Sequence, residues 1–176
     1  MIGRRNVVTE SQSADELLRD LEEQERRLIF PSFGYDEAWR LGTRLVELAR
    51  RRRAPVAIDI RCGAQQLFHS ALPGSSADND GWIDRKRRVV ERYGASSHLV
   101  GARFRARGTS FEESSRLDPG LYAAHGGSFP VRLAPDGPVV GSITLSGLTS
   151  AEDHQLIVEA LELHMEEGRR SARDRS

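Results

Sequence analysis

The first candidate site is a polar loop that leads into a helix at residues 73–86. Asp78 and Asn79 stand at the predicted start of this helix, where side-chain oxygens accept hydrogen bonds from free backbone N–H groups. Arg85 and Lys86 follow about one turn later and would supply positive charge. The free N–H groups of a helix start also attract anions. These residues predict either a simple helix cap or a cleft that holds a polar or anionic ligand.

Lys86 stands out because it falls near the middle of the apolar face of its own helix. That face is formed by Trp82, Val89, Val90 and Tyr93, which follow the i, i+7, i+8, i+11 spacing. The lysine could reach the edge of the core, pair with a buried carboxylate, or face a ligand pocket, and a desolvated lysine could also act as a nucleophile. Trp82 would either stack on a planar ligand or anchor the helix in the core.

Two histidines are further candidates. His125 precedes Gly126 and Gly127, and paired glycines permit a tight turn or the close approach of a ligand to the main chain. His125 could therefore bond to backbone within a turn, or act as an axial ligand to haem. His154 shares a helical face with Ile157, so its ring points toward the core. The structural interpretation of His154 is a histidine at the edge of the core, held by a neighbouring polar group.

Other chemical motifs are missing from the sequence. It contains no His-x-x-x-His, no paired cysteines, no EF-hand loop, no Walker lysine and no Gly-x-Ser-x-Gly elbow. No serine, histidine and aspartate show a spacing typical of a catalytic triad. The sequence therefore predicts no metal site and assigns no catalytic residue.

Composition excludes several classes of partner. The 176 residues contain 26 Lys and Arg and 26 Asp and Glu, so no net field attracts nucleic acid or an anionic membrane. No apolar run approaches the ~18 residues of a membrane span. The single cysteine, Cys62, cannot form an internal disulfide, and the N-terminus lacks a secretory apolar core. We expect a cytoplasmic protein.

The hydrophobic periodicity predicts an α+β fold. The predicted order is a helix after the capping box at Ser13, a helix after Asp36, strands at 56–60 and 66–70, a helix through Lys86, further strands within 95–127, strands at 129–133 and 139–145, and a helix after Ser150. Hairpin connections imply an antiparallel sheet. We expect one domain at 13–167, a flexible segment at 1–12 and a charged, disordered tail at 168–176.

Short blocks of sequence keep a distinctive order and spacing between residues 17 and 165. They are 56–60, 73–74, 78–79, 82–86, 96–97, 122–130, 141–148 and 153–154. Together they resemble the haem-degrading-domain family, which includes GlcG and HbpS, and within it the branch of small uncharacterised cytoplasmic proteins. The resemblance implies a profilin-like domain with a five-stranded antiparallel sheet flanked by helices. It also implies a symmetric homo-oligomer and makes haem a candidate cofactor.

Three functions from different classes follow. The first is a small-molecule-binding protein of the haem-degrading-domain type, for haem or another flat anionic ligand, with His125 or His154 as the haem ligand. Its candidate site residues are Asp78, Asn79, Trp82, Arg85, Lys86, His125, Gly126, Gly127 and His154.

The second function is a non-enzymatic oligomeric adaptor, in which Arg85 and Lys86 pair with acidic groups across a subunit interface. Trp39 and Val46, which lie beyond the main apolar stripe of the second helix, would suit such an interface. The third is an enzyme acting on a small organic acid, with Lys86 or His125 as its acid or base.

Overall fold

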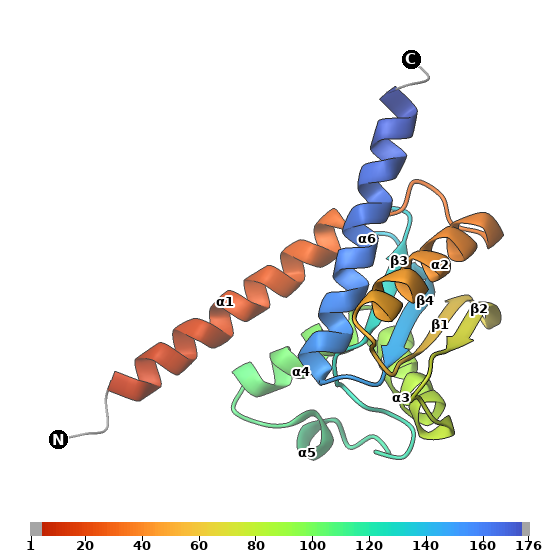
Figure 1. Cartoon of the computed structure of the whole chain (residues 1–176). Coiled ribbons are helices and arrows are strands. Elements are labelled where there is room, and N and C mark those ends of the chain that lie inside the picture. Colours follow the sequence, from red (N-terminus) through yellow and green to blue (C-terminus); the bar gives the residue numbers. More distant parts are fainter. Residues whose placement is uncertain (1–4, 174–176) are drawn as a thin grey trace.

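The computed structural model describes residues 5–173, whose helices cover both faces of an antiparallel sheet (Figure 1). The elements are α1 (Arg5–Arg27), α2 (Tyr35–Arg51), β1 (Ala57–Cys62), β2 (Gln65–Ala71), α3 (Ala77–Tyr93), α4 (Ser97–Ala106), α5 (Phe111–Ser115), β3 (Ser128–Arg132), β4 (Val139–Ser146) and α6 (Ser150–Arg173). The strand order is β2-β1-β4-β3, and every neighbouring pair is antiparallel. The α+β class and both predicted hairpins are confirmed.

The sheet has four strands in the described part of the chain, so the expectation of five is wrong. The segment in which further strands were predicted forms α4 instead. The cause is a helix cap, because the Ser96 hydroxyl accepts a hydrogen bond from Leu99 N at 3.2 Å. In addition, Ser96 N donates to the carboxylate of Glu25 on α1 at 2.7 Å.

Two helix boundaries also differ from the prediction. α1 begins at Arg5 rather than at the capping box of Ser13, and no glycine or proline interrupts residues 5–27. α6 continues to Arg173, beyond the expected domain end at residue 167. The outermost parts of the predicted terminal segments, residues 1–4 and 174–176, lie outside the described residues.

The two faces of the sheet differ in chemistry. One face is apolar and packs against α2 and α6; its buried residues include Ile58, Ile60, Phe129, Val131, Ile143 and Leu145. The opposite face, covered by α3, carries Asp59, Thr144 and Ser128 side by side on β1, β4 and β3. Ser128 Oγ and Thr144 Oγ1 are 2.8 Å apart and satisfy each other. These short side chains leave room under α3 for a long polar one.

A second, smaller core joins α1 to α4. Leu21 of α1 is buried in the same cluster as Leu99, Val100 and Phe111. The N-terminal half of α1 and the C-terminal end of α6 extend away from the sheet (Figure 1). α1 is therefore attached to the rest of the fold through its C-terminal half.

Candidate functional site

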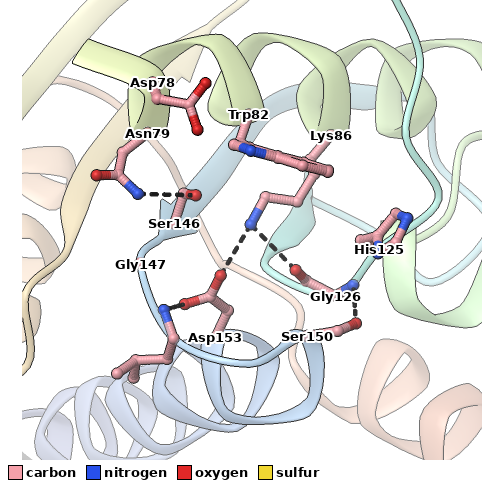
Figure 2. A pocket seen from close by; sticks show the side chains of 11 residues that line it. Asp78, Asn79, Trp82, Lys86, His125, Gly126, Ser146, Gly147, Ser150 and Asp153 are labelled. Carbon is pink, nitrogen blue, oxygen red and sulfur yellow. Dashed lines mark hydrogen bonds and ion pairs between the residues drawn. The ribbon is translucent and has the colours of Figure 1, made fainter. Parts of the chain in front are cut away.

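A cavity of about 260 Å³ lies where the starts of α3 and α6 meet the end of β4 and the segment that precedes β3 (Figure 2). We call it the α3–α6 pocket. It is lined by Asp78, Asn79, Trp82, Lys86, His125, Gly126, Ser146, Gly147, Leu148, Ser150 and Asp153. Six of the nine predicted site residues are among them. Arg85, Gly127 and His154 are not.

The start of α3 serves both as a cap and as a pocket wall. The side-chain oxygen of Asn79 accepts a hydrogen bond from Ser76 N at 2.8 Å. Its amide nitrogen points toward Ser146 on β4, at a long distance of 3.5 Å from the hydroxyl oxygen (Figure 2). Asp78 is exposed at the pocket rim. The cap and the cleft, which the sequence left as alternatives, coexist here.

Lys86 forms the floor of the pocket and is only 2% exposed. Its ammonium nitrogen donates to the carbonyls of Gly126 at 3.1 Å and Leu145 at 2.5 Å, and to the carboxylate of Asp153 at 3.0 Å. Burial lowers the pKa of Lys86, and Asp153 opposes that shift. Since three hydrogens meet three acceptors, the ammonium is saturated by the chain itself. Of the three interpretations of Lys86, two hold together: the lysine pairs with a buried carboxylate, and it also faces the pocket.

Asp153 connects this ion pair to the start of α6. Its second carboxylate oxygen accepts a hydrogen bond from Leu148 N at 2.9 Å. Burial raises the pKa of Asp153, while the charge of Lys86 and the backbone donors act against the rise. The pair thereby connects α3, the Gly126 segment, β4 and α6 at one point.

His125 and Trp82 form an aromatic mouth. The His125 side chain is 51% exposed, and its ring lies edge-to-face with Trp82 at a centroid distance of 5.4 Å. The Arg85 guanidinium lies 3.7 Å from the Trp82 ring centroid. Arg85 therefore sits beside the mouth although it does not line the cavity. Trp82 is half-buried and faces the pocket (Figure 2).

The two glycines are required by the close approach of neighbouring backbone. A Cβ on Gly126 would lie 2.0 Å from the carbonyl oxygen of Ser150, and Gly126 N donates to the Ser150 hydroxyl at 2.6 Å. Gly127 has φ +112°, and a Cβ there would lie 2.5 Å from the Lys86 ammonium. Gly127 does not line the pocket, but its lack of a side chain leaves room for the Lys86 ammonium at the pocket floor.

His154 lies outside the pocket. It is 3% exposed, its Nε2 is 2.8 Å from the side-chain oxygen of Gln24, and its ring lies 4.9 Å from that of His98 in a tilted arrangement. Its Nδ1 is buried without a hydrogen-bond partner in the described part of the chain. Burial lowers the pKa of His154 to about 3 and that of His98 to about 4, and nearby Arg105 adds to the shift of His98. His154 is a core-edge histidine, held by Gln24.

Sequence reasoning missed Ser146, Ser150 and Asp153 as pocket residues. Ser150 and Asp153 are first-turn residues of α6, and Ser146 ends a strand. A buried lysine demands a buried carboxylate, so a partner for Lys86 could be foreseen, but not that it would come from 67 residues further along the chain.

The free charges of the pocket are few. With Lys86 neutralised by Asp153, the charged side chains that remain are Asp78 at the rim, Arg85 beside the mouth, and Glu112, whose carboxylate lies 3.7 Å from His125 Nε2. Neutral groups supply the rest, namely the Asn79 amide and the Ser146 and Ser150 hydroxyls. In the part of the chain that the structure covers, no group of three or more His, Cys, Asp or Glu side chains is arranged to hold a metal ion. Nor is any helix within residues 5–173 long and apolar enough to cross a membrane.

Comparison with known proteins gives the class. Residues 33–162 match the family model described as haem degrading protein HbpS-like. The chain belongs to this HbpS-like family. α1 lies outside the matched residues.

The curated relatives are close in sequence. A UPF0303 protein of Streptomyces coelicolor is 71% identical over 143 residues, covering 81% of this chain and 90% of that protein. One from Streptomyces avermitilis is 69% identical over 146 residues, covering 83% and 89%. One from Edwardsiella ictaluri is 45% identical over 149 residues, covering 85% and 94%.

Solved structures confirm the HbpS-like fold. The crystal structure of the Ybr137w protein has a TM-score of 0.79 at 31% identity, covering 96% of this chain and 99% of that one. The crystal structure of HbpS has a TM-score of 0.58 at 19% identity, covering 73% of this chain and 86% of that one. The crystal structure of a PduOC–haem complex has a TM-score of 0.61 at 18% identity, covering 74% of this chain and 94% of that one. These last two show similarity of fold alone.

Proposed function

We propose that this protein binds a small molecule in the α3–α6 pocket. The observation that carries the proposal is that six candidate site residues, from two separate sequence segments, line one cavity with an aromatic pair at its mouth. Drug-sized ligands occupy pockets of about 300–1,000 Å³. A cavity of about 260 Å³ therefore suits a small ligand, or one part of a larger ligand that extends across the mouth.

Haem is the ligand we propose to test first, because the family includes haem-linked proteins and one fold neighbour is a haem complex. Three residues of the mouth suit such a group: His125 offers a half-exposed imidazole, Trp82 a ring and Arg85 a cation. Haem would have to displace Glu112, which lies 3.7 Å from His125 Nε2, and Arg85, which lies over the Trp82 ring. His154 is unsuited to be the axial ligand because it is buried and bonded to Gln24. Haem would supply a redox-active iron, and His125 would hold it.

A haemin titration of the purified protein tests this proposal. We expect a Soret band that saturates near one haem per chain and is lost in His125→Ala. His69→Ala is the matched control, because His69 is an accessible histidine on β2 that pairs with Asp80 at 2.9 Å, outside the pocket. A band that never saturates, or one that survives in His125→Ala, would overturn the assignment. Decay of the bound haem with ascorbate would add degradation to binding.

The contacts weaken two rival hypotheses. Lys86 is unsuited to pair across a subunit interface or to act as a nucleophile, because its ammonium is buried and saturated within its own chain. An enzyme acting on a small organic acid would have to rely on His125. An adaptor role would have to rely on other surfaces.

We also propose that the protein acts in the cytoplasm as a homo-oligomer. The free thiol of Cys62 is compatible with a reducing compartment. Exposed aromatic residues on α2 are compatible with self-association.

A further inference from the structure

The two edges of the sheet are treated differently by the fold. At the β3 edge, Arg132 O accepts a hydrogen bond from Phe30 N at 2.9 Å, and Ser128 N donates to the Ser97 hydroxyl at 3.1 Å. The loop before α2 and the start of α4 thus cover β3. At the β2 edge, the described residues place no hydrogen-bond partner on the outer side of the strand backbone.

The sequence of β2 places no charged residue or proline on this open edge, and its protection is a bulge at Leu67, which has no partner on β1. Its seven residues, QQLFHSA, include no Asp, Glu, Lys, Arg or Pro. Natural sheets usually protect a free edge with charges, proline, or a covering segment, because unpaired N–H and C=O groups recruit another strand. The register against β1 shifts at this bulge, between Ile60 and Arg61, so the bulge interrupts only the first part of β2 and residues 68–71 pair regularly with β1.

Two aromatic side chains of α2 stand directly beside this edge. Tyr35 is 69% exposed and Trp39 is 64% exposed, more than any other large hydrophobic side chain described. The Trp39 ring lies 6.0 Å from the Phe68 ring on β2, and the Tyr35 hydroxyl is 3.3 Å from the side-chain oxygen of Gln65. We define the β2 edge surface as β2 together with Tyr35 and Trp39.

We propose that the β2 edge surface is the interface between two copies of this chain, joined by antiparallel pairing of their β2 strands about a two-fold axis. The proposal rests on the proposed self-association and names its surface. A two-fold axis brings identical strands together antiparallel, and an uncharged strand meets its own copy without like-charge repulsion. Residues opposite each other share a face, so the Phe68 and Trp39 rings of both copies would gather on the α2 side.

The charges around the surface favour a second copy over a charged peptide or a nucleic acid. Arg40, on the same helix as Trp39, is paired within the chain to Glu37. The area that the Tyr35 and Trp39 side chains of two copies could bury is also comparable with that of a small stable interface. Aromatic side chains bury about 150–250 Å² each, so four rings that are two-thirds exposed would contribute roughly 400–700 Å². That is a large share of the ~1,200 Å² of a small stable interface, and paired strands would add the rest.

Light scattering coupled to size-exclusion chromatography tests the proposal on the full-length protein. We expect Trp39→Glu and Tyr35→Glu each to reduce the particle mass by half or more. Leu133→Glu, which alters a side chain that is 47% exposed beyond the end of β3, should leave the mass unchanged. Circular dichroism verifies that all three remain folded, as expected for exposed positions. A wild-type monomer at every concentration, or an unchanged mass in Trp39→Glu, would overturn the proposal.

Hydrogen exchange separates strand pairing from any other aromatic contact. In the wild type, we expect the outward-facing amides of 68–71 to be protected, and Trp39→Glu should expose them. Free exchange of these amides in a wild-type oligomer would overturn the β2 pairing. The haemin titration measures ligand binding in the α3–α6 pocket separately from self-association, because Trp39 does not line that pocket. A Trp39→Glu variant that loses mass and still binds haem supports the interface alone, whereas a wild-type oligomer that binds no haem counts only against the proposed ligand.

Discussion

The Lys86 ammonium and the Asp153 carboxylate lie 3.0 Å apart, with only 2% and 4% of their side chains exposed. Removal of one partner leaves the other charge buried without compensation. We therefore expect Lys86→Met to lower the free energy of unfolding by about 3–5 kcal/mol. Urea unfolding followed by circular dichroism measures the change. The double variant Lys86→Met, Asp153→Leu should recover most of the loss, since apolar replacement of a whole buried pair is close to neutral. A cost below about 1 kcal/mol for Lys86→Met would show that the pair does not hold the pocket together.

The neighbouring histidines His98 and His154 predict a loss of stability in acid. Their folded-state pKa values, about 4 and about 3, lie below the ordinary 6.5, so the unfolded chain binds more protons than the folded one. Stability contributed by the neutral histidines is present above pH 6.5 and falls as the pH drops toward 4, by up to about 1.4 kcal/mol per pH unit for each. Unfolding in urea at pH 7 and pH 5 measures the slope.

His154→Phe is the control for this pH dependence. Phenylalanine keeps a ring against Phe129 and His98 but cannot take up a proton. Its stability should change less with pH than that of the wild type, by about the contribution of one histidine. Equal slopes in both proteins would contradict the assignment.

Gly126 is expected to tolerate no side chain. A Cβ would collide with the carbonyl of Ser150, so Gly126→Ala should cost about 1–3 kcal/mol and displace the pocket wall. Gly81→Ala is the matched control, because nothing lies within 4 Å of a Cβ at this position of α3. Alanine is the better helix former, so the control should gain about 0.5–1 kcal/mol. Thermal unfolding compares the two, and an equal effect of both variants would refute the steric argument.

Arg85 distinguishes an anionic ligand from a neutral one. It is the cation nearest the mouth, 3.7 Å from the Trp82 ring centroid. For an anionic ligand such as haemin, Arg85→Gln should weaken binding about two- to fivefold, as expected for an exposed ion pair, and reduce its salt dependence. Titrations at low and high salt measure both effects. Unchanged affinity and salt dependence would show that Arg85 does not contact the ligand.

The local parts of the fold could be predicted from the sequence, whereas the long-range parts could not. The hairpins follow from short turns, and the burial of Lys86 follows from its place on an apolar helix face. Residues 97–106 were predicted as strand although Ser96 caps their helix locally; Glu25 on α1, which accepts a hydrogen bond from Ser96 N, adds a contact that no local pattern shows. The partner of Lys86 is equally distant in sequence, so no local pattern identifies it.

The site shows the same division. Asp78, Asn79 and Trp82, which the sequence groups together, line one cavity because one helix start positions all three. Sequence already placed the His154 ring toward the core and His125 in a turn beside glycines, but it left both open as haem ligands. Only packing decides between them: His154 is bonded to Gln24 behind the pocket wall, while His125 reaches the mouth.

Fluorescence of Trp82 during a haemin titration tests the central claim most directly. The chain has two tryptophans, so Trp39→Phe leaves Trp82 as the only reporter, and it lies in the pocket wall. We predict quenching that saturates at one haem per chain with the same midpoint as the Soret band, and loss of both signals when His125→Ala is added. A saturating Soret band without quenching of Trp82 would place haem elsewhere, and no saturation of either signal would contradict haem binding at this pocket.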